Sequence, residues 1–194
     1  RVESKATQLD IHSVDSARLI ETVTKRMQFQ FDEKRVTLNA NLPHDPILIL
    51  ADEDRALQIL TNLLGNALQY TPEAGAVNIS VQKDKNMARI SVRDSGVGIP
   101  PEHLAHIFDR FYRVDKSRSR ARGGSGIGLT IAKHLVEAQG GKIWAESEGE
   151  NKGKIVKVRE DGTVDEAAEL PLDFSITKNV VSLFISLLLL CLVF

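Results

Sequence analysis

Between Asp94 and about Gly126 the chain carries few periodic signals, although periodic segments flank it on both sides. This stretch contains Gly96-Val-Gly98, Pro100-Pro101, a short apolar segment at 104–108 that predicts a helix, and the basic run 113–122. A loop this long inside a compact domain is usually functional or disordered. The regular elements of the fold must therefore come from the segments on either side.

Helical and strand patterns alternate before this loop. Apolar residues at helical spacing predict a helix over 13–31, with Ser13 or Asp15 as its N-cap. Alternation over 36–42 and the apolar run 47–50 predict two strands. Asp52 can cap a second helix from residue 53 to about 70, whose apolar stripe contains Leu57, Leu60, Leu64 and Leu68.

Two alternating segments, 77–81 and 88–92, are joined by a polar turn and predict a hairpin. Gly128 opens a helix that continues through Val136, and 143–145 and 155–158 are further strand candidates. Helices and hairpins mix here without regular βαβ alternation. We therefore expect an α+β fold, a two-layer α/β sandwich.

Size and composition favour one domain with appendages, because 194 residues at 42% hydrophobic composition can bury one core. The formal net charge of -1 gives no general attraction to nucleic acid or to an anionic membrane. Cys191 is the only cysteine, so neither an internal disulfide nor a Cys-based zinc site can form. The chain starts at Arg1 without a signal-peptide pattern, and we interpret it as a piece of a longer protein.

Amide side chains mark one face of the predicted helix 53–70. Asn62 and Asn66 are four residues apart and share a face, which Gln58, Gln69 and Tyr70 extend. A neutral amide oxygen suits a Mg²⁺ ion that already carries triphosphate oxygens. A single Asn is more often simply exposed or capping, so this interpretation depends on the motifs that accompany it.

Asp94 stands where a predicted strand ends and glycines begin. A carboxylate there can accept a hydrogen bond from an exocyclic amine, and Gly96 and Gly98 allow the backbone to approach a planar ring. Taken alone, Asp-Ser-Gly-Val-Gly is most often an ordinary turn.

Gly124-Ser-Gly126-Ile-Gly128 precedes a predicted helix, so backbone N–H groups and the helix N-terminus can face phosphate oxygens. The segment lacks the Gly-Lys-Ser/Thr ending of a P-loop. It also does not open a parallel sheet, as a dinucleotide fingerprint requires. Both better-known glycine loops are therefore excluded by context.

Together these segments resemble the catalytic ATP-binding domain of sensor histidine kinases, in the GHKL superfamily with the Bergerat fold. The resemblance covers about residues 15–153. Residues 62–71 are similar to the N box, 94–99 to the first glycine box, 108–115 to the F box and 123–129 to the second glycine box. It implies a mixed, mostly antiparallel sheet packed on three main helices, with the loop between the glycine boxes as a long ATP lid.

The resemblance also implies ATP and Mg²⁺ as cofactors and assigns site residues. Asn66 would ligate Mg²⁺ with support from Asn62, Asp94 would bind the adenine amine, and Tyr70 would pack near the base. The expected catalytic residues are Asn62, Asn66, Arg110 and Arg113, the two arginines as phosphate contacts. The expected nucleotide-binding residues are Asn66, Gln69, Tyr70, Asp94, Gly96, Gly98, Ile99, Phe108, Gly124, Ser125, Gly126, Ile127, Gly128 and Leu129.

The residue at position 62 favours one chemistry within the superfamily. Relatives that hydrolyse ATP or phosphorylate serine look to carry Glu four residues before the metal-binding Asn, where it can act as a base. Asn62 cannot accept a proton at neutral pH, and an imidazole nucleophile needs less help than water or a hydroxyl. We therefore expect phosphoryl transfer to histidine, with a non-catalytic nucleotide-sensing module, or a GHKL ATPase or serine kinase, as alternatives.

The phosphoacceptor is not expected in this chain. None of its histidines lies in the Ser-His-Glu-Leu-Arg setting of the family's acceptor helix; they are His12, His44, His103, His106 and His134. We expect the acceptor upstream of Arg1, in the dimerisation domain of a homodimeric parent, and the receiver domain of a response regulator as the second partner. No nucleic-acid partner is expected, and the domain would be cytoplasmic in a parent of the cell inner membrane.

We expect three regions: 1–12 as the end of the dimerisation helix and a linker, 13–172 as the catalytic domain, and 173–194 as an apolar tail. After Gly153 the sequence departs from the family pattern. The uncharged run 180–194 is shorter than the ~17–25 residues that a spanning helix needs. A truncated membrane helix, a shallow membrane anchor and a non-native extension all remain open for it.

Overall fold

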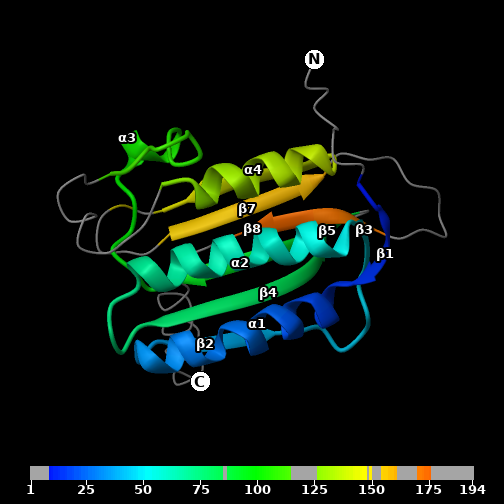
Figure 1. Ribbon diagram of the computed structural model, residues 1–194, viewed down its shortest axis with the longest axis horizontal. Helices are drawn as coiled ribbons and strands as arrows, with labels where there is room; N and C mark the ends of the chain where they lie inside the picture. Colours follow the sequence, from blue (N-terminus) through cyan, green and yellow to red (C-terminus); the bar gives the residue numbers. More distant parts are fainter. Residues whose placement is uncertain are drawn as a thin grey trace, which may run out of the picture.

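The computed structural model describes residues 9–84, 87–114, 126–147, 149, 154–160 and 170–175. Helices α1 (Ser16–Glu33), α2 (Glu53–Tyr70) and α4 (Gly128–Ala138) lie side by side on one face of a mixed sheet, and the short α3 (Pro101–Leu104) lies apart from them (Figure 1). The predicted α+β two-layer sandwich with three main helices is confirmed.

The sheet is mixed, and its longest ladders are antiparallel. Its strands follow the order β1 (His12–Asp15), β3 (Leu48–Ala51), β8 (Leu170–Ser175), β6 (Gly141–Glu146), β7 (Lys154–Glu160), β5 (Met87–Asp94), β4 (Ala76–Asp84) and β2 (Thr37–Asn41). The predicted hairpin is the β4–β5 pair, whose register runs from Val77 opposite Asp94 to Asp84 opposite Met87. β2 extends the sheet by pairing in parallel with β4.

Strand alternation and helical spacing place the core between the two layers. In β4 and β5 the apolar residues alternate with polar ones and point toward the helices, because successive side chains of a strand face opposite sides. The fully buried side chains from both layers include Phe31, Leu19, Ile20, Ile49, Ile59, Leu60, Leu63, Leu64, Ile79 and Ile90.

Helix α2 has the predicted bounds, and its N-cap Asp52 accepts a hydrogen bond from the Arg55 N–H at 3.0 Å. The first helix begins later than predicted, because His12–Asp15 form β1 and pair with β3. Of the two candidate caps, Asp15 is the one whose carboxylate accepts from the Ala17 N–H, at 2.9 Å. A four-residue edge strand with a polar sequence gives too little alternation to be predicted.

The helix predicted over 104–108 is wrong. Its place is taken by α3, which begins at Pro101 because a proline at the first helical position has its φ angle already set and loses no hydrogen bond. Residues 105–108 form turns, and Ile107 is buried while Leu104 and Phe108 pack against the core. The apolar spacing therefore reflects burial of this segment rather than a helix.

Several predictions concern residues outside the described ranges: the N-terminal segment 1–8, the lid residues 115–125 and the tail from 176 onward. The last described strand, β8, runs to Ser175, past the expected domain boundary at 172. None of the helices in the described ranges combines the length and the apolar composition that crossing a bilayer requires.

Two phenylalanines on α1 allow a matched test of the packing. Phe31 is 0% exposed and Phe29 is 75% exposed. We expect Phe31→Ala to lower the free energy of unfolding by about 3–5 kcal/mol and Phe29→Ala to change it by less than about 0.5 kcal/mol. Urea denaturation monitored by circular dichroism measures both. Equal losses in the two variants would contradict the placement of α1 on the sheet.

Candidate functional site

Helix α2 carries the two predicted amide residues on the flank of its buried face. Asn62 and Asn66 are half-buried, while Leu63, Leu64 and Ala67 beside them are buried in the core. The Asn62 Nδ2 atom is itself buried and has no hydrogen-bond partner within the described ranges. Because an unsatisfied buried amide costs free energy, a ligand oxygen at this position would stabilise the site.

The second glycine segment lies next to Asn62. A Cβ atom added at Gly128 would lie 3.8 Å from the Asn62 Oδ1 atom. α4 begins at Gly128, and its N-cap residue Ile127 makes no side-chain capping hydrogen bond. The first N–H groups of a helix have no partner inside the helix, so those of α4 are suited to bind an anion beside Asn62.

A further polar group of α4 has the same character. The Thr130 side chain is 5% exposed, and its Oγ1 atom has no hydrogen-bond partner in the described part of the chain. Thr130 lies in the first turn of α4, close in sequence to Gly128. Residues two apart on a helix do not share a face, so Thr130 faces away from the Gly128 position that lies beside Asn62.

The other end of α2 is tied to the strand end that carries Asp94. The Val97 N–H donates to the Tyr70 carbonyl at 3.3 Å. Asp94 is 2% exposed, and its Oδ1 atom accepts from the Gly96 N–H at 2.9 Å. This buried carboxylate therefore lies at the end of β5, directly before a loop that contacts the last residue of the amide-bearing helix.

Gly96 is required by space. A Cβ atom at this position would lie 2.6 Å from the Tyr70 carbonyl oxygen and 2.7 Å from the Asp94 Oδ1 atom, shorter than real Cβ contacts. Gly98 has a φ of 74°, a left-handed conformation that favours glycine. The next residue, buried Ile99, donates its N–H to the Ser147 Oγ atom at 3.0 Å and so attaches the loop to the end of β6.

The F box and the second glycine segment meet at the base of the predicted lid. The Phe111 N–H donates to the Gly126 carbonyl at 3.2 Å, and both residues have positive φ angles, 61° and 70°. Arg113 is half-buried, and its Cγ atom would lie 3.4 Å from a Cβ atom on Gly126. Arg110 is exposed. The structure therefore places Arg113 beside Gly126, whereas Arg110 lies on the surface.

The remaining predicted residues fall into two groups. Gln69, Tyr70 and Ile127 are half-buried, and Phe108 and Leu129 pack against the hydrophobic core. Gly124 and Ser125 lie outside the described residues. The predicted segments therefore meet along α2, with Gly128 near Asn62 in the middle of the helix and Gly96 near Tyr70 at its C-terminal end.

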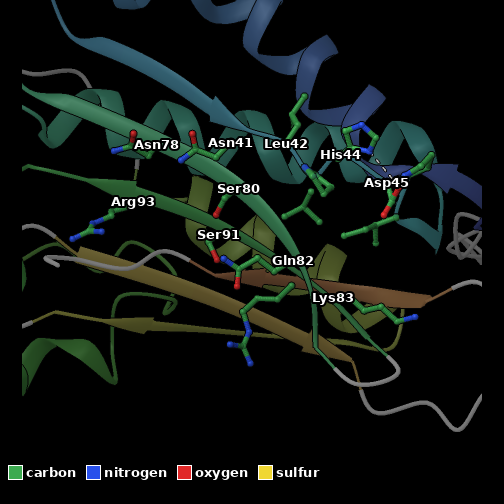
Figure 2. Close-up of a pocket in the computed structure, with 15 residues that line it drawn as sticks. Asn41, Leu42, His44, Asp45, Asn78, Ser80, Gln82, Lys83, Ser91 and Arg93 are labelled. Atoms are coloured by element: carbon green, nitrogen blue, oxygen red, sulfur yellow. Dashed lines mark hydrogen bonds and ion pairs between the residues drawn. The ribbon is translucent and has the colours of Figure 1, made fainter. Parts of the chain in front are cut away.

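A cavity of about 1020 Å³ lies elsewhere, on the opposite face of the sheet. Figure 2 shows Asn78, Ser80, Ser91 and Arg93 along it. Arg93 and Asp94 are neighbours in β5 and face opposite sides, so the cavity is separated from Asp94 by the sheet. Its polar lining is typical of the solvent-facing side of a two-layer sandwich. None of the predicted site residues in the described ranges lines it.

Residues 51–162 match the family model described as histidine kinase-, DNA gyrase B- and HSP90-like ATPase. The chain belongs to this ATPase family. Sensor histidine kinase WalK of Bacillus subtilis is 40% identical over 158 residues, which cover 80% of this chain and 26% of that protein. The chain thus spans about a quarter of the length of this curated relative.

Two solved histidine kinases have the same fold as this member of the family. Full-length ShkA in complex with AMPPNP is 30% identical with a TM-score of 0.70, covering 84% of this chain and 34% of ShkA. ThkA in complex with the response regulator protein TrrA is 26% identical with a TM-score of 0.64, covering 77% of this chain and 41% of ThkA. The resemblance to the ATP-binding catalytic domain of histidine kinases is confirmed.

Sequence reasoning missed two side-chain contacts that fix the C-terminal end of α2 in this ATPase-family domain. The Thr71 side chain is 1% exposed, and its hydroxyl donates to the Ala67 carbonyl at 2.7 Å. The Lys34 ammonium group donates hydrogen bonds to the Leu68 carbonyl at 2.5 Å and to the Gln69 carbonyl at 3.1 Å. Thr71 follows the predicted helix end and could have been recognised as a cap. Lys34 could not, because its partners lie far along the chain.

Two glycines provide a matched test of the close approach at Gly96. We expect Gly96→Ala to weaken ATP binding at least tenfold and to lower the free energy of unfolding by about 1–3 kcal/mol, because the new methyl group has no space. Gly65 is in α2 with no atom within 4 Å of an added Cβ. Gly65→Ala should preserve ATP binding and raise the free energy of unfolding by up to about 1 kcal/mol, because alanine favours the helix. Titration calorimetry and denaturation measure these values, and unchanged ATP affinity in Gly96→Ala would exclude this loop from the site.

Proposed function

We propose that this domain binds Mg-ATP along α2 and transfers the γ-phosphoryl group to a histidine on a separate dimerisation domain. The main support is that two segments lie against the same helix. The start of α4 lies beside Asn62 of α2, and the loop after Asp94 contacts Tyr70 at the end of α2. These three protein groups bind different kinds of ligand group. The amide and the helix N-terminus bind phosphate oxygens or a metal that carries them, and the buried carboxylate binds an amine. Together they match a nucleotide, whose phosphates and base need different partners.

The base would lie at the Tyr70 end of α2. The Asp94 carboxylate is an acceptor for the exocyclic amine of adenine, and Gly96 lets the backbone approach a flat ring. Tyr70 and Gln69 are half-buried beside it. The distance along the helix axis from residue 70 to residue 62 is about 12 Å, since an α-helix rises about 1.5 Å per residue.

The phosphates would lie at the Asn62 end. The first N–H groups of α4, starting at Gly128, would donate to phosphate oxygens, and Arg113 would contribute positive charge from the base of the lid. The Asn62 Nδ2 group, buried without a partner in the described ranges, supports a polar ligand at this position. Arg110 is proposed as a further phosphate contact that the closed lid would bring in.

The residues present fit a magnesium ion in one specific way. In the described part of the chain, no three His, Cys, Asp or Glu side chains gather as a metal site. We infer that the half-buried Asn66 would supply one amide oxygen, and that phosphate oxygens and water would be the other ligands, as suits a hard ion that keeps several waters. When bound, Mg²⁺ would neutralise charge on the triphosphate.

Transfer to histidine is favoured by the residue at position 62. Asn62 lies on the phosphate side of α2, where a hydrolysing enzyme needs a base to activate water, and an amide cannot take up a proton. An imidazole nucleophile needs no such base. Catalysis would consist mainly of positioning the γ-phosphoryl group in line and neutralising its charge.

The domain's partners are proposed from its relatives. ThkA, a histidine kinase of the same fold, was solved with a response regulator protein. We propose that the longer protein containing this chain is a homodimer that phosphorylates its own dimerisation domain and then a response-regulator receiver domain. It would work at the cell inner membrane, with this domain on the cytoplasmic side.

The proposed transfer is tested by mixing the chain with the isolated dimerisation domain of a sensor histidine kinase and γ-labelled ATP. We expect acid-labile, base-stable label on the partner, and none on the chain alone. Asp94→Asn is the control and should bind ATP at least about a hundredfold more weakly, because an amide can present a donor to the adenine amine. ATP binding without transfer would instead indicate a nucleotide sensor, and steady phosphate release from the chain alone would indicate an ATPase.

Asn66→Ala tests the magnesium assignment. In the parent chain, ATP affinity should be higher with Mg²⁺ than with a chelator, and this ratio should fall toward one in the variant because the protein ligand is gone. Asn39→Ala, an exposed amide on β2, is the matched control and should keep the full ratio. An affinity shift in Asn66→Ala that is equal with and without Mg²⁺ would remove Asn66 from the metal site.

A further inference from the structure

We propose that Lys34 is a positioning residue for the nucleotide base, acting from the end of α1 on the last turn of α2. Lys34 is the C-cap residue of α1 and is half-buried. Its ammonium group donates to the Leu68 carbonyl at 2.5 Å and to the Gln69 carbonyl at 3.1 Å. This inference rests on the proposed location of the base beside Tyr70 and Asp94.

The carbonyl groups at the end of α2 show why this contact matters. The last four carbonyls of a helix have no partner within the helix. Here the Ala67 carbonyl accepts from Thr71, through both its N–H and its hydroxyl, and the Tyr70 carbonyl accepts from the Val97 N–H. The two carbonyls between them, those of Leu68 and Gln69, accept from Lys34.

The chemistry of the donor suits this position. An ammonium group has three donors and can bridge two adjacent carbonyls. A positive charge is also stabilising at the C-terminal, negative end of the helix dipole. Since α2 has no basic residue in its own last turn, a cation from α1 takes that role.

The backbone next to Lys34 is also hydrogen-bonded to the segment that follows α2. The Ala74 N–H donates to the Arg35 carbonyl and the Thr37 N–H to the Gly75 carbonyl, each at 2.9 Å. Segment 34–37 therefore runs along segment 68–75. Arg35 has a φ of 56°, uncommon for a residue with a side chain, and the Val36 N–H donates to the Phe31 carbonyl at 2.9 Å directly after it.

The consequence reaches Asp94 through one further hydrogen bond. The Tyr70 carbonyl, next in the chain after Gln69, accepts from the Val97 N–H in the Asp94 loop. If the last turn of α2 is not fixed, the side chains of Gln69 and Tyr70 and the Asp94 loop lose their relative positions. Lys34 thus controls the base end of the site at the C-terminus of α2, whereas Gly128 meets Asn62 near the middle of the helix.

The Lys34→Met variant tests the proposal. Its ATP affinity is measured at a temperature well below the midpoint of its thermal unfolding, so that the protein is folded. We expect ATP to bind about tenfold more weakly and the preference for ATP over GTP to narrow, with the same fold-change in the presence and absence of Mg²⁺. Lys25→Met is the matched control, since Lys25 is on the same helix with its side chain 79% exposed, and it should bind as the parent chain does. A residue needed only for stability would leave the affinity of the folded protein unchanged.

Affinity for ATP in Lys34→Met within twofold of the parent chain would overturn the proposal. A parent chain that itself fails to bind ATP would instead overturn the proposed nucleotide site. If Lys34→Met does not fold, NMR of the lysine ammonium groups in the parent chain decides. The Lys34 signal should shift on addition of ATP while the Lys25 signal stays fixed, and an unmoved Lys34 signal would contradict the role.

Discussion

The closing of the last turn of α2 is the interaction on which the rest of the site depends. Its terminal carbonyls accept hydrogen bonds from three separate parts of the chain: Lys34 after α1, Thr71 at the helix end and Val97 beyond β5. A buried carbonyl without a partner costs about 1–3 kcal/mol, so these partners are held firmly. As a result, the turn after α1 and the loop that carries Asp94 are fixed against the same helix end.

The middle of the same helix meets the remaining segments. Asn62 lies near Gly128 at the start of α4, and the Phe111–Gly126 hydrogen bond joins the two strands of chain that lead into the predicted lid. In the proposed site, the C-terminal half of α2 sets the distance between the base at Tyr70 and the phosphates at Asn62. Glycine is needed where backbone must come close to the helix or its loops, as at Gly96, where any Cβ atom would clash with the Tyr70 carbonyl.

The two-layer architecture determines which face of the sheet carries the predicted site residues. Helices cover one face, and alternation along β5 turns Asp94 toward them and Arg93 away. The polar cavity on the uncovered face is thus a product of the fold, whereas the site residues predicted from the sequence lie around α2, the start of α4 and the end of β5.

The sequence by itself determined the elements whose signals are local. The bounds of α2 and its Asp52 cap and the β4–β5 hairpin follow from periodicity or from residues close in sequence, whereas the four motif segments were assigned by their resemblance to the family. Tertiary structure alone decided the edge strand β1, the start of α3 at Pro101, and the parallel pairing of β2 with β4. It also decided the contact of Lys34 with carbonyls 34 and 35 residues away. Contacts between distant residues leave no periodic trace in the sequence, because they depend on how whole elements pack rather than on the neighbours of each residue.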